Sequence, residues 1–154
     1  MEINSKTENK NIERTAFGIL LTVSFCHLLD DTMHSMLPAI YPMLKDEIGL
    51  SFLQIGIITF VLQITSSIIQ PFVGLYADKH HSWWQLPVSM IFTLIGIFML
   101  SYANSFYVIL LSVSLFGLGS SIFHPQGSQV AQQASGGRKG LAQSIFQVGG
   151  NGGF

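Results

Sequence analysis

Charged residues are scarce in this sequence, and two long stretches contain none. Only 10% of the 154 residues are Asp, Glu, Lys or Arg, against about 25% in ordinary soluble domains. No charged residue lies between Glu47 and Asp78, or between Lys79 and Arg138. About 20 apolar residues are enough to cross the hydrocarbon core of a bilayer. Both stretches exceed that length, so we expect an integral membrane protein.

Cysteine is almost absent, and so are the other features that would indicate a soluble function. Cys26 is the single cysteine, which excludes a disulfide framework or a thiolate metal site within this sequence. The net charge of −1 and the lack of a basic cluster do not favour nucleic-acid binding. No nucleophile and base share a spacing typical of a membrane enzyme. We therefore expect neither an enzyme nor a cofactor, and a membrane-bound sensor or enzyme is the alternative from another class.

The apolar segments predict an all-α membrane protein with four complete transmembrane helices and the start of a fifth. Residues 1–14 are polar and predict a cytoplasmic tail, and the helices occupy residues 15–154. The predicted helices cover 15–38, 52–77, 86–102, 106–134 and 141 onward. Pro38 and Pro42 are expected to end the first helix. Ser51 is expected to cap the second, and Pro71 to kink it.

The basic residues predict the orientation in a cell membrane, taken as an inner membrane where there are two. With the N-terminus inside, a single basic residue, Lys45, is external. The other six are cytoplasmic: Lys6, Lys10, Arg14, Lys79, Arg138 and Lys139. Cytoplasmic loops carry an excess of Lys and Arg in membrane proteins. The bias favours a cytoplasmic N-terminus.

Two adjacent carboxylates, Asp30 and Asp31, interrupt the first apolar segment, and His27 and His34 flank them. The four positions follow i, i+3, i+4 and i+7, so they share one face of a helix. An acid at the centre of a membrane helix costs about 2.5–3.5 kcal/mol. The nine Leu, Ile, Phe and Val residues of 17–37 return only about 0.3–0.6 kcal/mol each. The acids must therefore face protein or water.

An intramembrane acid pair with two histidines predicts proton handling. We expect Asp31 to bind and release a coupling proton beside Asp30, and His27 to share it. His34 completes this group. A packing salt bridge at Asp30 or Asp31 is the alternative. No complete set of metal ligands forms around the two histidines, so no metal site is expected.

Polar residues on the later helices recur at helical spacing and predict a shared interior cavity. On the second helix the stripe contains Gln63, Ser67, Gln70 and Gly74; the fourth and fifth helices carry similar stripes. The residues expected to bind a substrate are His124, Gln63, Gln70, Gln147 and Asn151. An anionic substrate would favour a protonated histidine there. The alternative is that these side chains only bond neighbouring helices.

Several segments resemble one family of membrane transporters. The loop after the second helix, residues 74–79, is similar to the G-x-x-x-D-[RK] signature of the major facilitator superfamily. It departs from that signature at residues 81–83, where the family usually has a glycine and basic residues. The segments that resemble the fosmidomycin resistance protein group of efflux pumps are 27–31, 39–42, 54–56, 123–125, 134–138 and 140–151.

The resemblance implies a fold of twelve helices in two halves, with a central cavity and alternating access. This chain would be the N-terminal part of the first half, truncated, and the missing C-terminal half would be its partner. Gly74, Asp78 and Lys79 would help to latch the two halves together. Many drug exporters of the superfamily carry an arginine on the fourth helix. Here Ser112-Val113-Ser114 stands in that region, so coupling would depend on Asp31 and His27.

The function that follows is proton-coupled efflux of small polar or anionic drugs such as fosmidomycin-like antibiotics. Its partners would be a small-molecule substrate, protons and the lipid bilayer. Two alternatives remain: a proton symporter for a small polar metabolite, or an inactive truncated transporter fragment.

Overall fold

The computed structural model describes residues 15–79 and 84–153, and the side chains of 77 and 78 are excluded from that description. The predicted polar tail, residues 1–14, lies outside the described residues. Every regular element in the described part is a helix: α1 (Phe17–Ile48), α2 (Phe52–Gln63), η1 (Ile64–Ile68), α3 (Gln70–Lys79), α4 (Gln85–Ser101), α5 (Phe106–Gln133) and α6 (Lys139–Asn151). The predicted all-α class is confirmed.

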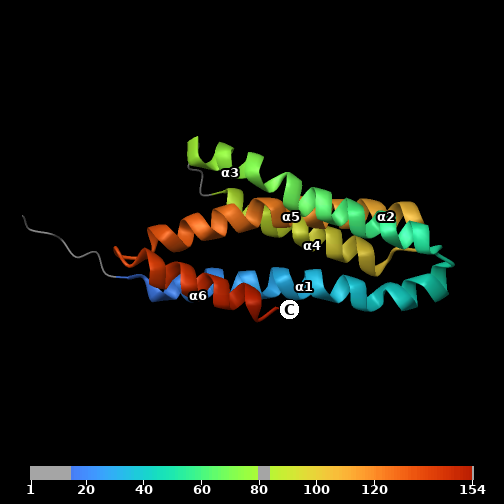
Figure 1. Cartoon of the computed structure of the whole chain (residues 1–154), viewed down its shortest axis with the longest axis horizontal. Helices are drawn as coiled ribbons and strands as arrows, with labels where there is room; N and C mark the ends of the chain where they lie inside the picture. Colours follow the sequence, from blue (N-terminus) through green and yellow to red (C-terminus); the bar gives the residue numbers. More distant parts are fainter. Residues whose placement is uncertain (1–14, 80–83, 154) are drawn as a thin grey trace, which may run out of the picture.

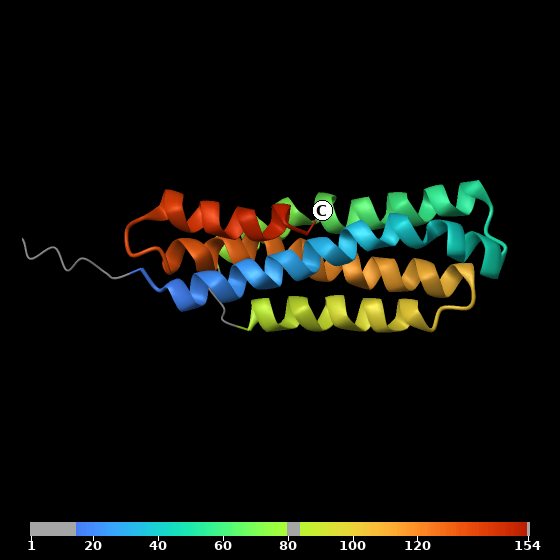
Figure 2. The same cartoon turned by 90° about the horizontal axis from the view of Figure 1, so that it is seen from below.

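The helices lie side by side in an elongated bundle with α5 at its centre, in contact with every other element (Figure 1). Figure 2 shows α1 in front of α5, with α4 along one side and α6 and α2 along the other. Two helical segments are long and apolar enough to cross a membrane, Phe52–Tyr76 and α5, and α4 is apolar but shorter. At 32 residues, α1 is about 48 Å long, more than the roughly 30 Å hydrocarbon core.

The prediction that Pro38 and Pro42 end the first helix is wrong, because α1 continues through both to Ile48. Leu37 and Leu44, on either side of Pro42, are buried in the core between α1, α2 and α5. Helices that pack within a membrane protein tolerate proline, since neighbouring groups satisfy the freed carbonyls. Packing on both sides of the prolines therefore maintains the helix.

The actual end of α1 is set by a glycine. Gly49 adopts a left-handed conformation with φ of 75°, and its N–H donates to the Lys45 carbonyl over 3.0 Å. Glycine reaches this conformation without the steric cost that a Cβ atom brings. The residue in the sequence that marks the end of α1 is therefore Gly49, and not the prolines before it.

Ser51 caps α2, as predicted. Its hydroxyl accepts a hydrogen bond from the Gln54 N–H at 3.2 Å, and the Gln54 side chain accepts one from the Ser51 N–H at 2.8 Å. This reciprocal arrangement satisfies two donors at the helix start. The loop between α1 and α2 is thus held at both ends by local hydrogen bonds.

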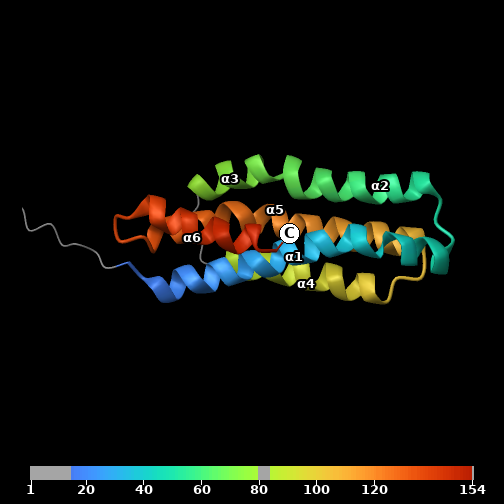
Figure 3. The ribbon, with the colours of Figure 1, turned by 60° about the horizontal axis from the view of Figure 1, so that its bottom comes forward.

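The irregularity expected at Pro71 begins earlier, in the π-helical turn η1. Pro71 has no N–H to donate to the preceding turn, so the regular hydrogen-bond pattern must change just before it. Figure 3 shows α2 and α3 continuing along the same edge of the bundle on either side of this turn. A π turn inside a membrane helix frequently marks a functional position.

The start of α1 and the start of α6 lie at the same end of the bundle. Thr15 donates through its hydroxyl to the Ser135 carbonyl at 2.8 Å, and the Ala16 N–H donates to the Ala134 carbonyl at 2.9 Å. The start of α1 therefore lies at the same end as the basic residues Arg138 and Lys139 that open α6. Figure 1 places the end of α3 at this end as well.

Glycines bring α4 and α5 into backbone contact. A Cβ atom at Gly119 would lie 2.6 Å from the Thr93 nitrogen and 2.7 Å from the Ser89 oxygen. A Cβ atom at Gly96 would lie 2.6 Å from the Phe116 nitrogen. Small residues at such crossings allow membrane helices to approach closely.

We expect Gly119→Ala to destabilise the folded chain by about 1–3 kcal/mol, because the added methyl group meets backbone atoms that cannot move independently. The measurement is unfolding in mixed micelles followed by helical circular dichroism. The matched control is Gly56→Ala on α2, where an added Cβ meets nothing within 4 Å. This control should be neutral or stabilising by up to about 1 kcal/mol through helix propensity. Equal effects of the two substitutions would contradict the packing argument.

Candidate functional site

The acid pair of α1 lies inside the bundle, away from the surface that a bilayer would cover. Asp30 is 1% exposed and Asp31 is 6% exposed. His27 is also buried, at 4%. The sequence argument that these acids must face protein is therefore consistent with their burial.

Asp30 joins three helices through its two carboxylate oxygens. The Ser120 hydroxyl on α5 donates to Oδ2 at 2.7 Å, and the Thr93 hydroxyl on α4 approaches Oδ1 at 3.4 Å. On the same carboxylate, His124 Nε2 lies 3.6 Å and His34 Nδ1 lies 3.9 Å from Oδ2. Two neutral hydroxyl donors and two imidazoles thus surround this acid.

Asp31 is held chiefly by imidazoles. His27 Nε2 lies 3.2 Å from its Oδ2 atom, and His124 Nε2 lies 3.7 Å from its Oδ1 atom. On the α6 side, Gly150 packs directly against this pair, and a Cβ atom there would lie 2.6 Å from Asp31 Oδ2. Glycine at this position leaves room for the acid and the ring together.

The orientation of the His27 ring is set by Phe146 on α6. The ring stacks on Phe146 with a centroid distance of 4.1 Å, and Nδ1 lies 2.9 Å from the Phe146 carbonyl oxygen. A carbonyl only accepts hydrogen bonds, so we assign the hydrogen to Nδ1. His27 Nε2 then faces a carboxylate oxygen, and a hydrogen bond between them needs one further proton. The 3.2 Å contact is therefore a candidate site for a shared proton.

A polar cavity of about 270 Å³ adjoins these acids. We call it the polar pocket; its lining residues are His34, Gln63, Ser66, Ser67, Gln70, Ser120 and His124. They come from α1, α2, η1, α3 and α5, and every one of their side chains can form hydrogen bonds. The π turn η1 contributes the two neighbouring serines.

The polar pocket brings together three of the predicted substrate residues, Gln63, Gln70 and His124. It adds His34, which the sequence assigned to protons only, and Ser120, which the sequence did not single out. Ser120 occupies the position beside the predicted polar stripe of α5. Its only sequence signal was its place next to Ser121 in a run of small residues.

The other two predicted substrate residues lie elsewhere. Gln147 and Asn151 are exposed on α6 and do not line the polar pocket. Their stripe reaches α5 through Gln143, whose side-chain oxygen accepts a hydrogen bond from Ser128 at 3.0 Å. These two residues therefore face outward from the described bundle.

The residues of the loop signature lie at the end of α3. Gly74 faces Pro125 of α5, where an added Cβ would lie 3.8 Å from the proline Cβ. Lys79 is exposed at the last position of α3. The side chain of Asp78 lies outside the described part of the chain. The latch role expected of these residues stays a prediction.

Judged by distance alone, two groups of side chains could hold a metal ion. The ligand atoms of His27, Asp31 and His124 lie within 4.8 Å of one another, as do those of Asp30, Asp31 and His34. Each group includes at least one contact between a histidine and a carboxylate, at 3.2–3.9 Å.

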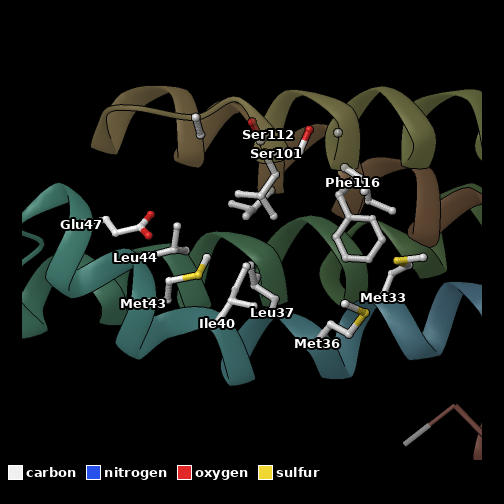
Figure 4. A pocket seen from close by; sticks show the side chains of 15 residues that line it. Met33, Met36, Leu37, Ile40, Met43, Leu44, Glu47, Ser101, Ser112 and Phe116 are labelled. Atoms are coloured by element: carbon white, nitrogen blue, oxygen red, sulfur yellow. The ribbon is translucent and has the colours of Figure 1, made fainter.

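A second cavity, of about 280 Å³, lies between α1, α4 and α5 and is apolar. Figure 4 shows Met33, Met36 and Met43 around it, with Glu47 at one end. Because hydrocarbon and methionine side chains dominate its lining, it offers little to orient a polar substrate. The polar pocket is the better candidate for that role.

The comparisons with known proteins agree with this architecture. The profile of the Major Facilitator Superfamily matches residues 20–154. The chain is 55% identical over 138 residues to the fosmidomycin resistance protein of Escherichia coli (strain K12), which covers 90% of this chain and 34% of that protein. It is 44% identical over 156 residues to the uncharacterized MFS-type transporter YfnC of Bacillus subtilis (strain 168), covering 99% of this chain and 38% of YfnC.

A more distant relative is the probable nitrate transporter NarT of Staphylococcus carnosus (strain TM300), 26% identical over 133 residues, or 86% of this chain and 34% of NarT. The chain thus spans about a third of the length of the curated relatives that it matches. No solved structure matches it. The matched profile covers most of the sequence, and the chain belongs to the Major Facilitator Superfamily of membrane transporters.

Proposed function

We propose that this chain is the N-terminal part of a proton-coupled secondary transporter that exports small polar or anionic drugs such as fosmidomycin-like antibiotics. The observation that carries the proposal is the buried histidine–aspartate cluster beside the polar pocket. His124 lines that pocket and approaches both carboxylates, at 3.6 Å and 3.7 Å. Protons and cargo would therefore bind within contact of each other, which allows direct coupling between them.

In this mechanism Asp31 exchanges the coupling proton and His27 shares it. The 3.2 Å contact between them supports this assignment, and the Phe146 carbonyl fixes the ring that accepts the proton. Asp30 and His34 complete the proton-binding group. Alternating access would expose the pair first to one side of the membrane and then to the other, as one part of the transporter rocks against another.

The cargo would bind in the polar pocket through Gln63, Gln70 and His124. Amide and imidazole groups can orient a polar molecule by directed hydrogen bonds. We propose that Gln147 and Asn151 contact the cargo from α6 once further helices cover their exposed face. Gly74, Asp78 and Lys79 would latch the cytoplasmic side, with the N-terminus in the cytoplasm.

A proton symporter for a small polar solute is the second candidate. The observation in its favour is the sequence match to a relative named as a probable nitrate transporter, which extends over 86% of this chain. The fosmidomycin resistance protein matches at 55% identity, which favours drug export as the first candidate. The two candidates differ in the direction that protons and cargo take.

We expect Asp31→Asn to abolish proton-driven export, because an amide cannot exchange the proton that the carboxylate holds. The test uses a hybrid transporter in which this chain replaces the matching segment of the E. coli fosmidomycin resistance protein. Fosmidomycin resistance of cells that lack their own exporter should fall to the level of cells with no transporter. Efflux from loaded vesicles gives the same comparison without growth.

Asp46→Asn is the matched control for that substitution. Asp46 is an exposed acid near the end of α1, so its loss should leave resistance unchanged. Both variants must reach the membrane in equal amounts, as checked by immunoblotting. Full resistance in the Asp31→Asn hybrid would contradict the assigned proton site.

Reversal of the pH gradient separates export by exchange from symport. In vesicles that contain the hybrid transporter, exchange predicts that fosmidomycin moves opposite to the protons, and that its direction reverses with the gradient. Symport predicts movement in the direction of the protons. The measurement is radiolabelled cargo inside the vesicles, with a proton ionophore as the control that removes the gradient. Movement with the protons would replace the first candidate by the second.

A further inference from the structure

The polar pocket has acids behind it and, within the described part of the chain, no fixed positive charge beside it. Asp30 and Asp31 are the buried carboxylates, and the histidines around them are His27, His34 and His124. The helices α2, η1 and α4 contain no Asp, Glu, Lys, Arg or His. In α3 the charged residues are the last two, 78 and 79, and in α6 the first, Lys139. The charge that the described residues bring to the pocket therefore depends on protons.

His124 links the pocket to both acids. Among the described residues that line the polar pocket, it alone forms ion-pair contacts with both Asp30 and Asp31, at 3.6 Å and 3.7 Å. Its ring lies 5.0 Å from that of His27, edge to face, so the third imidazole is close as well. A proton on His124 is thus within reach of the carboxylates on one side and of a bound molecule on the other.

The charges at this site set a condition on its cargo. With both carboxylates ionised and all three histidines neutral, the cluster carries a charge of −2 and repels an anion in the pocket. Each proton that binds to a histidine adds one positive charge and one further N–H donor. An anionic oxygen group becomes compatible with the site as these protons bind.

We propose that the polar pocket binds anionic oxygen groups only together with protons on its histidines, and that His124 is the residue through which anion and proton are linked. The proposal rests on the proposed function in one respect, since it takes the polar pocket as the cargo site. It adds the chemical class of the ligand and the sign of the linkage.

The sign of the linkage bears on the direction of transport. An anion that binds together with protons shares a loaded state with them, as symport requires, so for an anionic cargo this linkage favours the second candidate over proton exchange. A cargo with a cationic or strongly hydrogen-donating group would take the place of the proton beside the carboxylates, as exchange requires. The charge of the cargo at the pocket therefore determines which cycle this site can support.

The test measures proton uptake when nitrate binds to the full 154-residue chain in lipid nanodiscs. Nitrate is a suitable probe because it does not titrate near neutral pH, so any proton change belongs to the protein. A pH indicator in weakly buffered solution should report net proton uptake. Nitrate binding should tighten about tenfold for each unit of lowered pH, for each proton taken up. Proton release, pH-independent binding, or no binding at low pH would overturn the proposal.

Substitutions then locate the protons. His124→Gln should keep a hydrogen-bonding side chain but reduce proton uptake and flatten the pH dependence of nitrate binding. The double substitution His80→Gln and His81→Gln removes two histidines outside the described residues and should change neither quantity. Helical circular dichroism and size-exclusion chromatography check that each variant folds. An unchanged pH dependence in His124→Gln would assign the linkage elsewhere and overturn the role of this residue.

Sulfate gives a second measurement that needs no variant. As a dianion it should draw more protons per bound ion than nitrate onto the unmodified chain, and equal or smaller uptake would contradict the charge argument. These binding measurements are independent of the transport assays. If Asp31→Asn leaves export unchanged, the proposed function is contradicted and the anion–proton linkage still stands. If the nitrate test fails, only the linkage is contradicted.

Discussion

The cost of a charge inside a membrane is the constraint that organises this structure. Each buried carboxylate of α1 would cost about 2.5–3.5 kcal/mol at the bilayer centre without partners. The bundle supplies those partners from three other helices: Ser120 and His124 on α5, Thr93 on α4, and the Phe146 carbonyl on α6 that orients His27. The cluster therefore ties the helices together as well as offering a site for protons.

Close backbone contact is what allows these short side chains to meet. Gly119 brings α4 against α5 within reach of the Thr93 side chain, and Gly150 brings α6 against the His27 and Asp31 side chains. Gly149 lies against the Ser24 carbonyl, one turn earlier on α1. A larger residue at any of these positions would separate the helices and leave polar atoms without partners. Glycine in this chain thus serves the polar site as much as the packing.

The sequence was sufficient to predict the helical class, the starts of all five predicted helices to within two residues, and the acid–histidine group. Those predictions rest on long apolar runs and on the free-energy cost of placing a charge in the bilayer. Both can be judged from a short stretch of sequence. It failed at Pro38 and Pro42, because tertiary packing of Leu37 and Leu44 maintains the helix there. Ser120 and Thr93 were missed because a small hydroxyl residue in an apolar helix has no distinct pattern until its partner is known.

The structure gives the two adjacent acids of α1 different partners. Asp30 receives hydrogen bonds from two hydroxyl groups, those of Ser120 and Thr93, in addition to its contacts with His124 and His34. The described contacts of Asp31 are with His27 and His124, whose own charges depend on protons. Two of the contacts of Asp30 come from hydroxyl groups, which stay in place whether or not a histidine carries a proton, whereas the side-chain contacts described for Asp31 are both with histidines. This difference supports the proposal that Asp31 exchanges the proton while Asp30 ties α1 to α4 and α5.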